Sequence, residues 1–122
     1  MNVLGVLILS TDPLAAALLG AAVELVGHTP WFPRENENPR DTLRRLRPAV
    51  VLIDCDHEDA CTETFFGPAM MTGARLAVFS SSRSRRALEP IAAEFGVQVF
   101  ALPIDFDELS RILEGRLDPP KP

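Results

Sequence analysis

The sequence predicts one α/β domain with a central parallel β-sheet covered by helices on both faces. Three observations lead to this prediction. Apolar runs recur along the chain, at residues 3–9, 49–54, 76–79 and 97–100. The runs are continuous rather than alternating, which is typical of strands buried on both faces. Segments with helical periodicity separate them, so that strand and helix alternate about five times.

The first strand, residues 3–9, is followed by a helix with a clear start. Asp12 can cap a helix, and Pro13 suits the first helical position. Gly27 ends the segment. Between them, apolar residues recur at helical spacing, namely Leu14, Leu18, Ala21, Ala22 and Leu25.

The next part of the chain contains a weak strand, a short helix and a strong strand. Residues 29–33 form a short strand or edge segment, and residues 34–39 have the composition of a loop. Residues 41–47 form a basic amphipathic helix that ends before Pro48. Residues 49–54 then form a strongly apolar strand that ends in an aspartate.

The second half of the chain continues the alternation with helix 61–71, strand 76–79, helix 85–95, strand 97–100 and helix 105–117. We expect the first of these helices to be interrupted or bent near Gly67-Pro68, and Pro90 to lie in the first turn of the next helix or to kink it. The last helix has an apolar side formed by Phe106, Leu109, Ile112 and Leu113.

This order fits a flavodoxin-like fold, a (βα)5 three-layer sandwich with a central five-stranded parallel sheet. In such folds, sites lie at the carboxyl ends of the central strands. The predicted pocket at these ends contains Ser10, Thr11, Asp12, Asp54, Asp56, Ser80, Ser81 and Leu102. Residues 1–117 form the domain, and residues 118–122 form a Pro-rich tail or the start of a linker.

Composition narrows the function. The 122 residues carry a net charge of −5, which does not favour binding to nucleic acid or to an anionic membrane. Residues 3–9 are too short to span a bilayer and are not flanked like a signal peptide. Lys121, in the tail, is the single lysine, so the fold offers none for a Schiff base or a phosphate loop. We expect a cytoplasmic protein that is not an enzyme.

Several motifs, taken in this order and spacing, resemble the receiver domain of two-component response regulators over nearly the full chain. Pro13 and Gly27 bracket the first helix as in receivers. The run RPAVVLID resembles RPDLVLLD and places Asp54 at the phospho-acceptor position. Ser80, after LAVF, falls at the hydroxyl position that senses the phosphoryl group. The run LPIDFDEL resembles KPFDPDEL.

The resemblance also shows what this chain lacks. The acidic pair expected after the first strand is replaced by Ser10 and Thr11, and the expected lysine is Leu102. Neutral hydroxyls weaken binding of a divalent ion, and an apolar side chain cannot stabilise a transferring phosphoryl group. We therefore expect Mg²⁺ binding to be weak or absent and Asp54 to be a relic or a structural group. The chain is predicted to be an atypical receiver, or pseudo-receiver, in signal transduction.

The resemblance implies protein contact through residues 85–95, 97–102 and 105–117, with a signalling partner or in a homodimer. Two alternatives stay open. The first is a phospho-accepting switch that uses Asp54 with altered chemistry. The second is an anion- or nucleotide-sensing module that uses the same pocket, for which the candidate residues are Arg83, Arg85 and Arg86. These arginines are also interpreted as a solvated charged surface, which is the more common case.

Other residues have a structural explanation that is simpler than a functional one. His57 stands among acidic residues, but no second histidine is near in sequence to complete a metal site. Cys55 and Cys61 are expected to be reduced, with Cys55 a small buried apolar group. Asp12 is interpreted as a helix cap rather than a metal ligand. The pair Trp31-Phe32 is interpreted as packing rather than a contact surface.

Overall fold

The structure is a computed structural model that describes residues 3–56, 62–80, 82–101 and 104–115. Five parallel strands form one sheet in the order β2-β1-β3-β4-β5. The strands are β1 (Gly5–Leu9), β2 (Thr29–Trp31), β3 (Val50–Asp54), β4 (Arg75–Phe79) and β5 (Gln98–Phe100). The helices are α1 (Pro13–Leu25), α2 (Pro39–Leu46), α3 (Glu63–Met71), α4 (Ser82–Phe95) and α5 (Phe106–Glu114).

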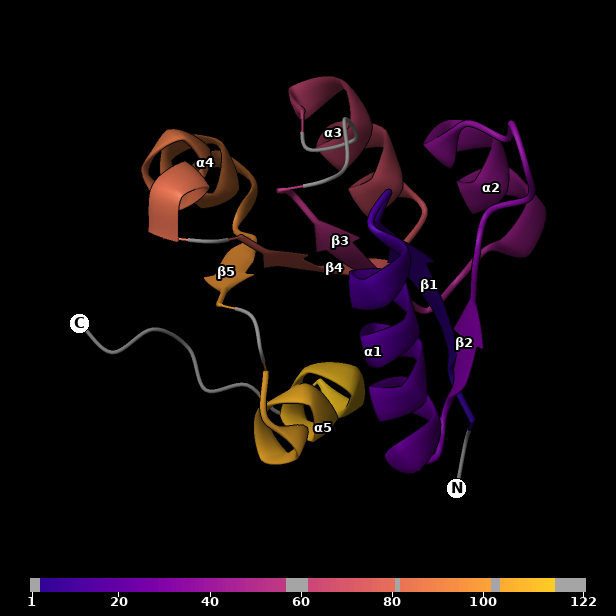
Figure 1. The fold of residues 1–122 in the computed structure, drawn as a ribbon. Helices are drawn as coiled ribbons and strands as arrows, with labels where there is room; N and C mark the ends of the chain where they lie inside the picture. Colours follow the sequence, from indigo (N-terminus) through magenta and orange to yellow (C-terminus); the bar gives the residue numbers. More distant parts are fainter. Residues whose placement is uncertain (1–2, 57–61, 81, 102–103, 116–122) are drawn as a thin grey trace.

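The helices cover both faces of the sheet, as predicted. In Figure 1, α2, α3 and α4 lie above the sheet, and α1 and α5 lie below it. The strand order changes direction between β1 and β3, because the chain runs outward from β1 to β2 and then crosses back to β3. The predicted flavodoxin-like sandwich is therefore confirmed.

Successive residues of the central strands pack alternately into two separate hydrophobic cores. Val6 and Ile8 pack in the cluster on the α1–α5 side, whereas Leu7 and Leu9 pack in the cluster on the other side. This follows from the alternation of side chains along a strand. All five residues of β3 are buried, which explains why its sequence is apolar without a break before Asp54.

Several element boundaries differ from the prediction. The helix α2 begins at Pro39, two residues early, because Asn38 Oδ1 accepts the Asp41 N–H at 2.9 Å and caps it. The helix α4 begins at Ser82, which places Pro90 in its interior instead of its first turn. An interruption of α3 near Gly67-Pro68 is wrong, since one helix runs through Pro68, while a bend at this point stays a prediction. The helix α5 ends before Gly115, which takes a left-handed φ of 70°.

The apolar stripe that predicted α1 is not the face on which this helix packs. Leu19, Gly20 and Val23 are its buried residues, while Leu14 and Leu18 are mostly exposed. Gly20 lies so close to Phe32 that an added Cβ would stand 2.9 Å from the Phe32 ring. The helix therefore packs through a face on which a small residue admits its neighbour. None of the helices described is long and apolar enough to cross a membrane.

Trp31 and Phe32 pack on opposite sides of the sheet edge. The Trp31 ring lies over Gly5 of β1, and Phe32 reaches Gly20 of α1. Phe32 keeps 44% of its surface exposed. The interpretation as a packing residue is confirmed for Trp31, whereas Phe32 packs against Gly20 and is also exposed in part.

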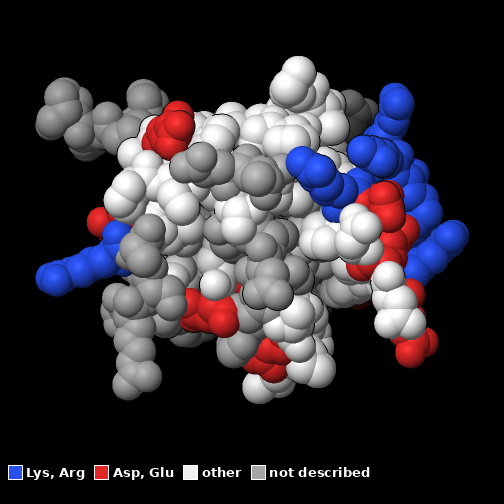
Figure 2. All heavy atoms as spheres, turned by 90° about the horizontal axis from the view of Figure 1, so that it is seen from above, with Lys and Arg blue, Asp and Glu red and all other residues white. Residues whose placement is uncertain are grey.

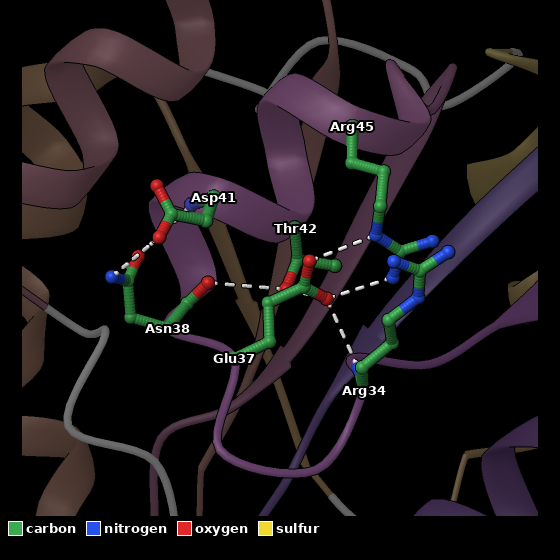
Figure 3. Close-up of polar contacts among 6 residues, drawn as sticks. All are labelled: Arg34, Glu37, Asn38, Asp41, Thr42 and Arg45. Carbon is green, nitrogen blue, oxygen red and sulfur yellow. Dashed lines mark hydrogen bonds and ion pairs between the residues drawn. The ribbon is translucent and has the colours of Figure 1, made fainter.

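The loop before α2 is held by one carboxylate. Glu37 accepts hydrogen bonds from the Arg34 N–H, the Thr42 hydroxyl and the Arg45 guanidinium (Figure 3). The contact between Arg45 Nη2 and Glu37 Oε1 is 2.7 Å. These donors, with Arg45 the largest influence, hold the pKa of the Glu37 carboxyl well below its usual range. The same contact raises the pKa of Arg45.

Candidate functional site

Four polar side chains meet at the carboxyl ends of β1, β3 and β4. Ser10 follows β1, Asp54 ends β3, Asp56 lies in the next turn, and Ser80 follows β4. The Ser10 hydroxyl donates to Asp54 Oδ2 at 2.9 Å. The Ser80 hydroxyl donates to Asp56 Oδ1 at 3.3 Å. The structure thus brings together the predicted pocket residues of three neighbouring strands.

Asp54 is enclosed and hydrogen-bonded through both carboxylate oxygens. Its exposed fraction is 0%, although it ends a strand at the edge where sites form. While Oδ2 accepts from Ser10, Oδ1 accepts the Asp56 N–H at 3.1 Å. A buried carboxylate needs such donors, because an unpaired buried charge is strongly unfavourable. In this geometry, Asp54 joins the start of the turn after β3 to the end of β1.

Ser10 is the central connector of the site. Besides donating to Asp54, its hydroxyl oxygen accepts the Asp12 N–H at 3.1 Å. It also lies 3.4 Å from the Asp12 carbonyl oxygen. The sequence did not predict this role for Ser10, which was placed in the pocket as a replacement for an acid. The available signal was its position directly after β1, beside the end of β3.

The Asp12 side chain caps the helix α1. Its Oδ1 accepts the Leu14 N–H at 3.1 Å, and its extended backbone precedes Pro13. The prediction of a helix cap is confirmed. Thr11 is exposed. Within the described ranges, no group of three histidine, cysteine, aspartate or glutamate side chains is arranged to hold a metal ion.

Some predicted site residues fall outside the described residues. These are Ser81, Leu102 and His57. Arg83 and Arg85 lie on α4, whose side chains at these positions are not described. Arg86 is described and exposed on the same helix.

Cys55 corrects the expectation of a reduced thiol. It takes part in a disulfide bond. The other cysteine of the sequence, Cys61, lies outside the described residues. Cys55 also packs, partly buried, against the apolar core beneath α3. Whether a disulfide forms depends on the distance between two Cα atoms in the folded chain, which cysteine spacing in a sequence does not give.

The densest positive charge among the described residues lies around α2. Figure 2, which looks down on the face with α2, α3 and α4, shows basic side chains gathered at the α2 end. The exposed arginines there are Arg34, Arg40, Arg44, Arg45 and Arg47. Acidic residues lie among these arginines, since Arg45 pairs with Glu37 and Arg44 with Asp41. The patch is thus a mixed-charge surface with an excess of arginine.

The described part of the chain also has an apolar groove that the sequence did not predict. It has a volume of about 450 Å³ and runs between α1 and the start of α5. It is lined mainly by apolar residues, including Leu14, Leu18, Ile104 and Phe106. No motif marks such a groove, because its two walls come from opposite ends of the chain.

Comparison with solved structures shows the same fold in receiver domains. The signal receiver domain of a modulated diguanylate cyclase from Desulfovibrio desulfuricans G20 has 26% identity and a TM-score of 0.74, and the match covers 94% of each chain. A response regulator from Thermotoga maritima has 16% identity and a TM-score of 0.71, with coverage of 94% of this chain and 98% of the other. The chemotaxis protein CheY4 of Vibrio cholerae has 13% identity and a TM-score of 0.71, with coverage of 95% and 100%.

No protein-family model and no curated protein matches the sequence. The structural matches nevertheless span nearly the whole chain and nearly the whole of each matched domain. The fold is that of a response regulator receiver domain, and the resemblance seen in the sequence is confirmed at the level of the fold. Receiver-domain signal transduction is the class of function that this fold supports.

Proposed function

We propose that this chain is an atypical receiver that signals through protein contacts, without Mg²⁺-dependent phosphorylation of Asp54. The observation that carries the proposal is that Asp54 is buried and hydrogen-bonded through both carboxylate oxygens. A phospho-acceptor must present a carboxylate oxygen to an incoming phosphodonor. Asp54 instead has 0% exposure and accepts hydrogen bonds on both oxygens, from Ser10 and from the Asp56 N–H.

The donor set at this position does not fit a magnesium site of the receiver kind. Magnesium prefers oxygen ligands with negative charge in near-octahedral geometry. Ser10 and Thr11 are neutral, and the Ser10 hydroxyl points its proton at Asp54. The Asp12 carboxylate caps α1, and Asp56 accepts from Ser80. Asp54 is better explained as a structural carboxylate that ties β1 to β3.

The proposed contact surface is formed by α4, β5 and α5. Its exposed charges include Arg86, Glu94, Asp105, Asp107 and Arg111. Opposite charges on one surface favour a partner with the complementary pattern, because such patterns steer encounter and reject wrong partners. The role is non-enzymatic in this proposal, since the surface acts by contact alone.

The test is an amide NMR titration of the labelled protein with Mg²⁺ and then with beryllofluoride, which mimics a phosphoryl group on aspartate. We expect no shifts centred on Asp54 and Ser80. A variant with Ser10→Asp, Thr11→Asp and Leu102→Lys is the matched control, because it returns the acids and the lysine of the receiver pattern. It should respond to Mg²⁺ where the natural sequence does not.

Two results would contradict the proposal. Beryllofluoride-dependent shifts at Asp54 and Ser80 that disappear in Asp54→Asn would establish a phospho-accepting switch with altered chemistry. Shifts at Arg86 produced by inorganic phosphate or a nucleotide, and weakened by Arg86→Ala, would establish the sensing module instead. Each outcome points to a different class of function, so one set of spectra separates them.

A further inference from the structure

The helix α1 is apolar on every side, although only one side packs on the sheet. Glu24 is the single charged residue among its thirteen. Outside the packed side, Leu14, Leu18 and Leu25 are exposed by 67%, 62% and 73%. A helix that is apolar all round is normally enclosed by other protein. The exposed face of α1 is therefore a surface that favours being covered.

The exposed leucines continue into the groove between α1 and α5. Leu14 and Leu18 are part of its α1 wall, and Phe106, which is 53% exposed, is part of its α5 wall. The two helices lie side by side on one face of the sheet (Figure 1). The exposed stripe of α1 consists of Leu14, Leu18, Ala21 and Leu25. Together with Ile104 and Phe106 of the groove, it forms one apolar surface, which we call the α1 surface.

The spacing of the stripe matches a helix–helix seam. Leu14, Leu18, Ala21 and Leu25 are separated by four, three and four residues, the alternation found at core positions of paired helices. The pattern is also symmetric about its centre. If a second α1 runs antiparallel, Leu14 faces Leu25 of the other copy and Leu18 faces its Ala21. A two-fold interface requires this self-complementarity, because each patch must fit itself.

The area is sufficient for a weak dimer. With about 150 Å² for each whole large side chain, the exposed parts of the three leucines and Phe106 amount to roughly 400 Å² per copy. Two copies bury about twice that, and the alanines between them and the groove walls bring the total near the ~1,000 Å² of a small specific interface. The antiparallel arrangement also aligns the two helix dipoles favourably.

We propose that the α1 surface is a homodimer interface, in which a second copy of this chain packs its α1 antiparallel against the first. The end of the second α1 that carries Leu25 lies over Leu14 and Phe106. This inference rests on the exposed apolar surface and goes beyond the proposed function, because it does not depend on the state of Asp54. It uses α1, on the opposite side of the sheet from α4.

The test is sedimentation velocity of the whole chain over about a hundredfold range of concentration, at low and at high salt. We expect a monomer–dimer equilibrium in the natural sequence. Leu18→Glu should weaken dimerisation at least ~10-fold, because it places a charge at the centre of the seam. Met71→Glu is the matched control, since Met71 is 90% exposed on α3 and lies away from the α1 surface. It should leave the dimer intact.

Salt gives an independent readout. Each copy carries a net charge of −5, and the seam is apolar, so screening of the repulsion should strengthen the dimer. A dimer held by the mixed charges of α4 and α5 would weaken instead.

Circular dichroism establishes that Leu18→Glu is folded. Should that variant not fold, Leu25→Glu makes the same change at the end of the helix.

A monomer at every concentration would overturn the inference, and so would a dimer that Leu18→Glu leaves unchanged. A dimer lost in Arg111→Glu but kept in Leu18→Glu would place the interface on α5 away from α1. These outcomes are distinct from failure of the proposed function, which is decided by the beryllofluoride spectra. The two ideas can therefore fail separately.

Discussion

Ser10→Ala is the sharpest test of the structural role assigned to Asp54. The substitution removes the hydroxyl that donates to the buried Oδ2 at 2.9 Å and accepts the Asp12 N–H at 3.1 Å. A hydrogen bond to a charged group contributes about 1.5–3 kcal/mol, and a neutral one about 1 kcal/mol. The expected loss in free energy of unfolding is therefore about 2–4 kcal/mol.

The assay is urea unfolding followed by the fluorescence of Trp31, the single tryptophan. With a slope of ~1–3 kcal/mol per molar urea, the midpoint should fall by on the order of 1 M. Ser110→Ala is the matched control, because the Ser110 hydroxyl lies 3.5 Å from Glu114 at an exposed site. It should change the free energy of unfolding by less than about 0.5 kcal/mol.

A double-mutant cycle with Asp54→Asn isolates the contact between Ser10 and Asp54. The two substitutions should be non-additive by at least ~1 kcal/mol, since both remove the same interaction. Suppose that Ser10→Ala lowers the free energy of unfolding no more than Ser110→Ala does. The hydrogen bond from Ser10 to Asp54 would then not stabilise the buried carboxylate. The structural account of this carboxylate would then be refuted, whatever the phosphorylation experiments gave.

Three other substitutions test separate parts of the fold. Gly5→Ala places a Cβ 2.1 Å from the Trp31 ring, so we expect a loss of about 1–3 kcal/mol from overpacking and a shifted Trp31 emission spectrum. An unchanged spectrum would contradict the packing of Trp31. Glu37→Gln should destabilise the protein at neutral pH, because the Arg45 contact stabilises the ionised carboxyl. That contribution is present above the usual pKa of 4.5 and is lost as the pH falls below it, so the two unfolding curves should converge in acid. A difference in free energy of unfolding between the two proteins that grew in acid would contradict this expectation. Phe66→Ala, at a site with 0% exposure, should cost about 3–5 kcal/mol by calorimetry. A smaller loss would mean that the cavity collapses.

Local pattern was enough to predict the order of strands and helices. Continuous apolar runs such as 49–54 require burial on both sides, and only a parallel sheet with two helical layers provides it. The cap at Asp12 was also predictable, because capping depends on residues close in sequence. The start of α2 was missed although Asn38-Pro39 is a typical beginning of a helix.

The position of the candidate site could be predicted from the sequence, but the burial and hydrogen bonding of Asp54 could not. That Asp54 ends a strand beside Ser10 and Ser80 follows from the order of elements. Its complete burial and its bond to Ser10 depend on how β1 and β3 align, which sets the distance between residues 44 positions apart. The disulfide of Cys55 depends in the same way on folded distances.

The sequence by itself determined the parallel sandwich, the receiver-like order of motifs and the loss of the acidic pair at Ser10 and Thr11. Only the tertiary structure decided which face of each helix is covered. On α1, Leu14, Leu18 and Leu25 have the period that predicts a helix, yet Leu19, Gly20 and Val23 are buried. The physical reason is that periodicity records which residues share a side of a helix. Which side meets the sheet depends on the shapes of residues far away in the sequence. For α1 these are Phe32, which packs against Gly20, and the start of α5, which lies across the groove.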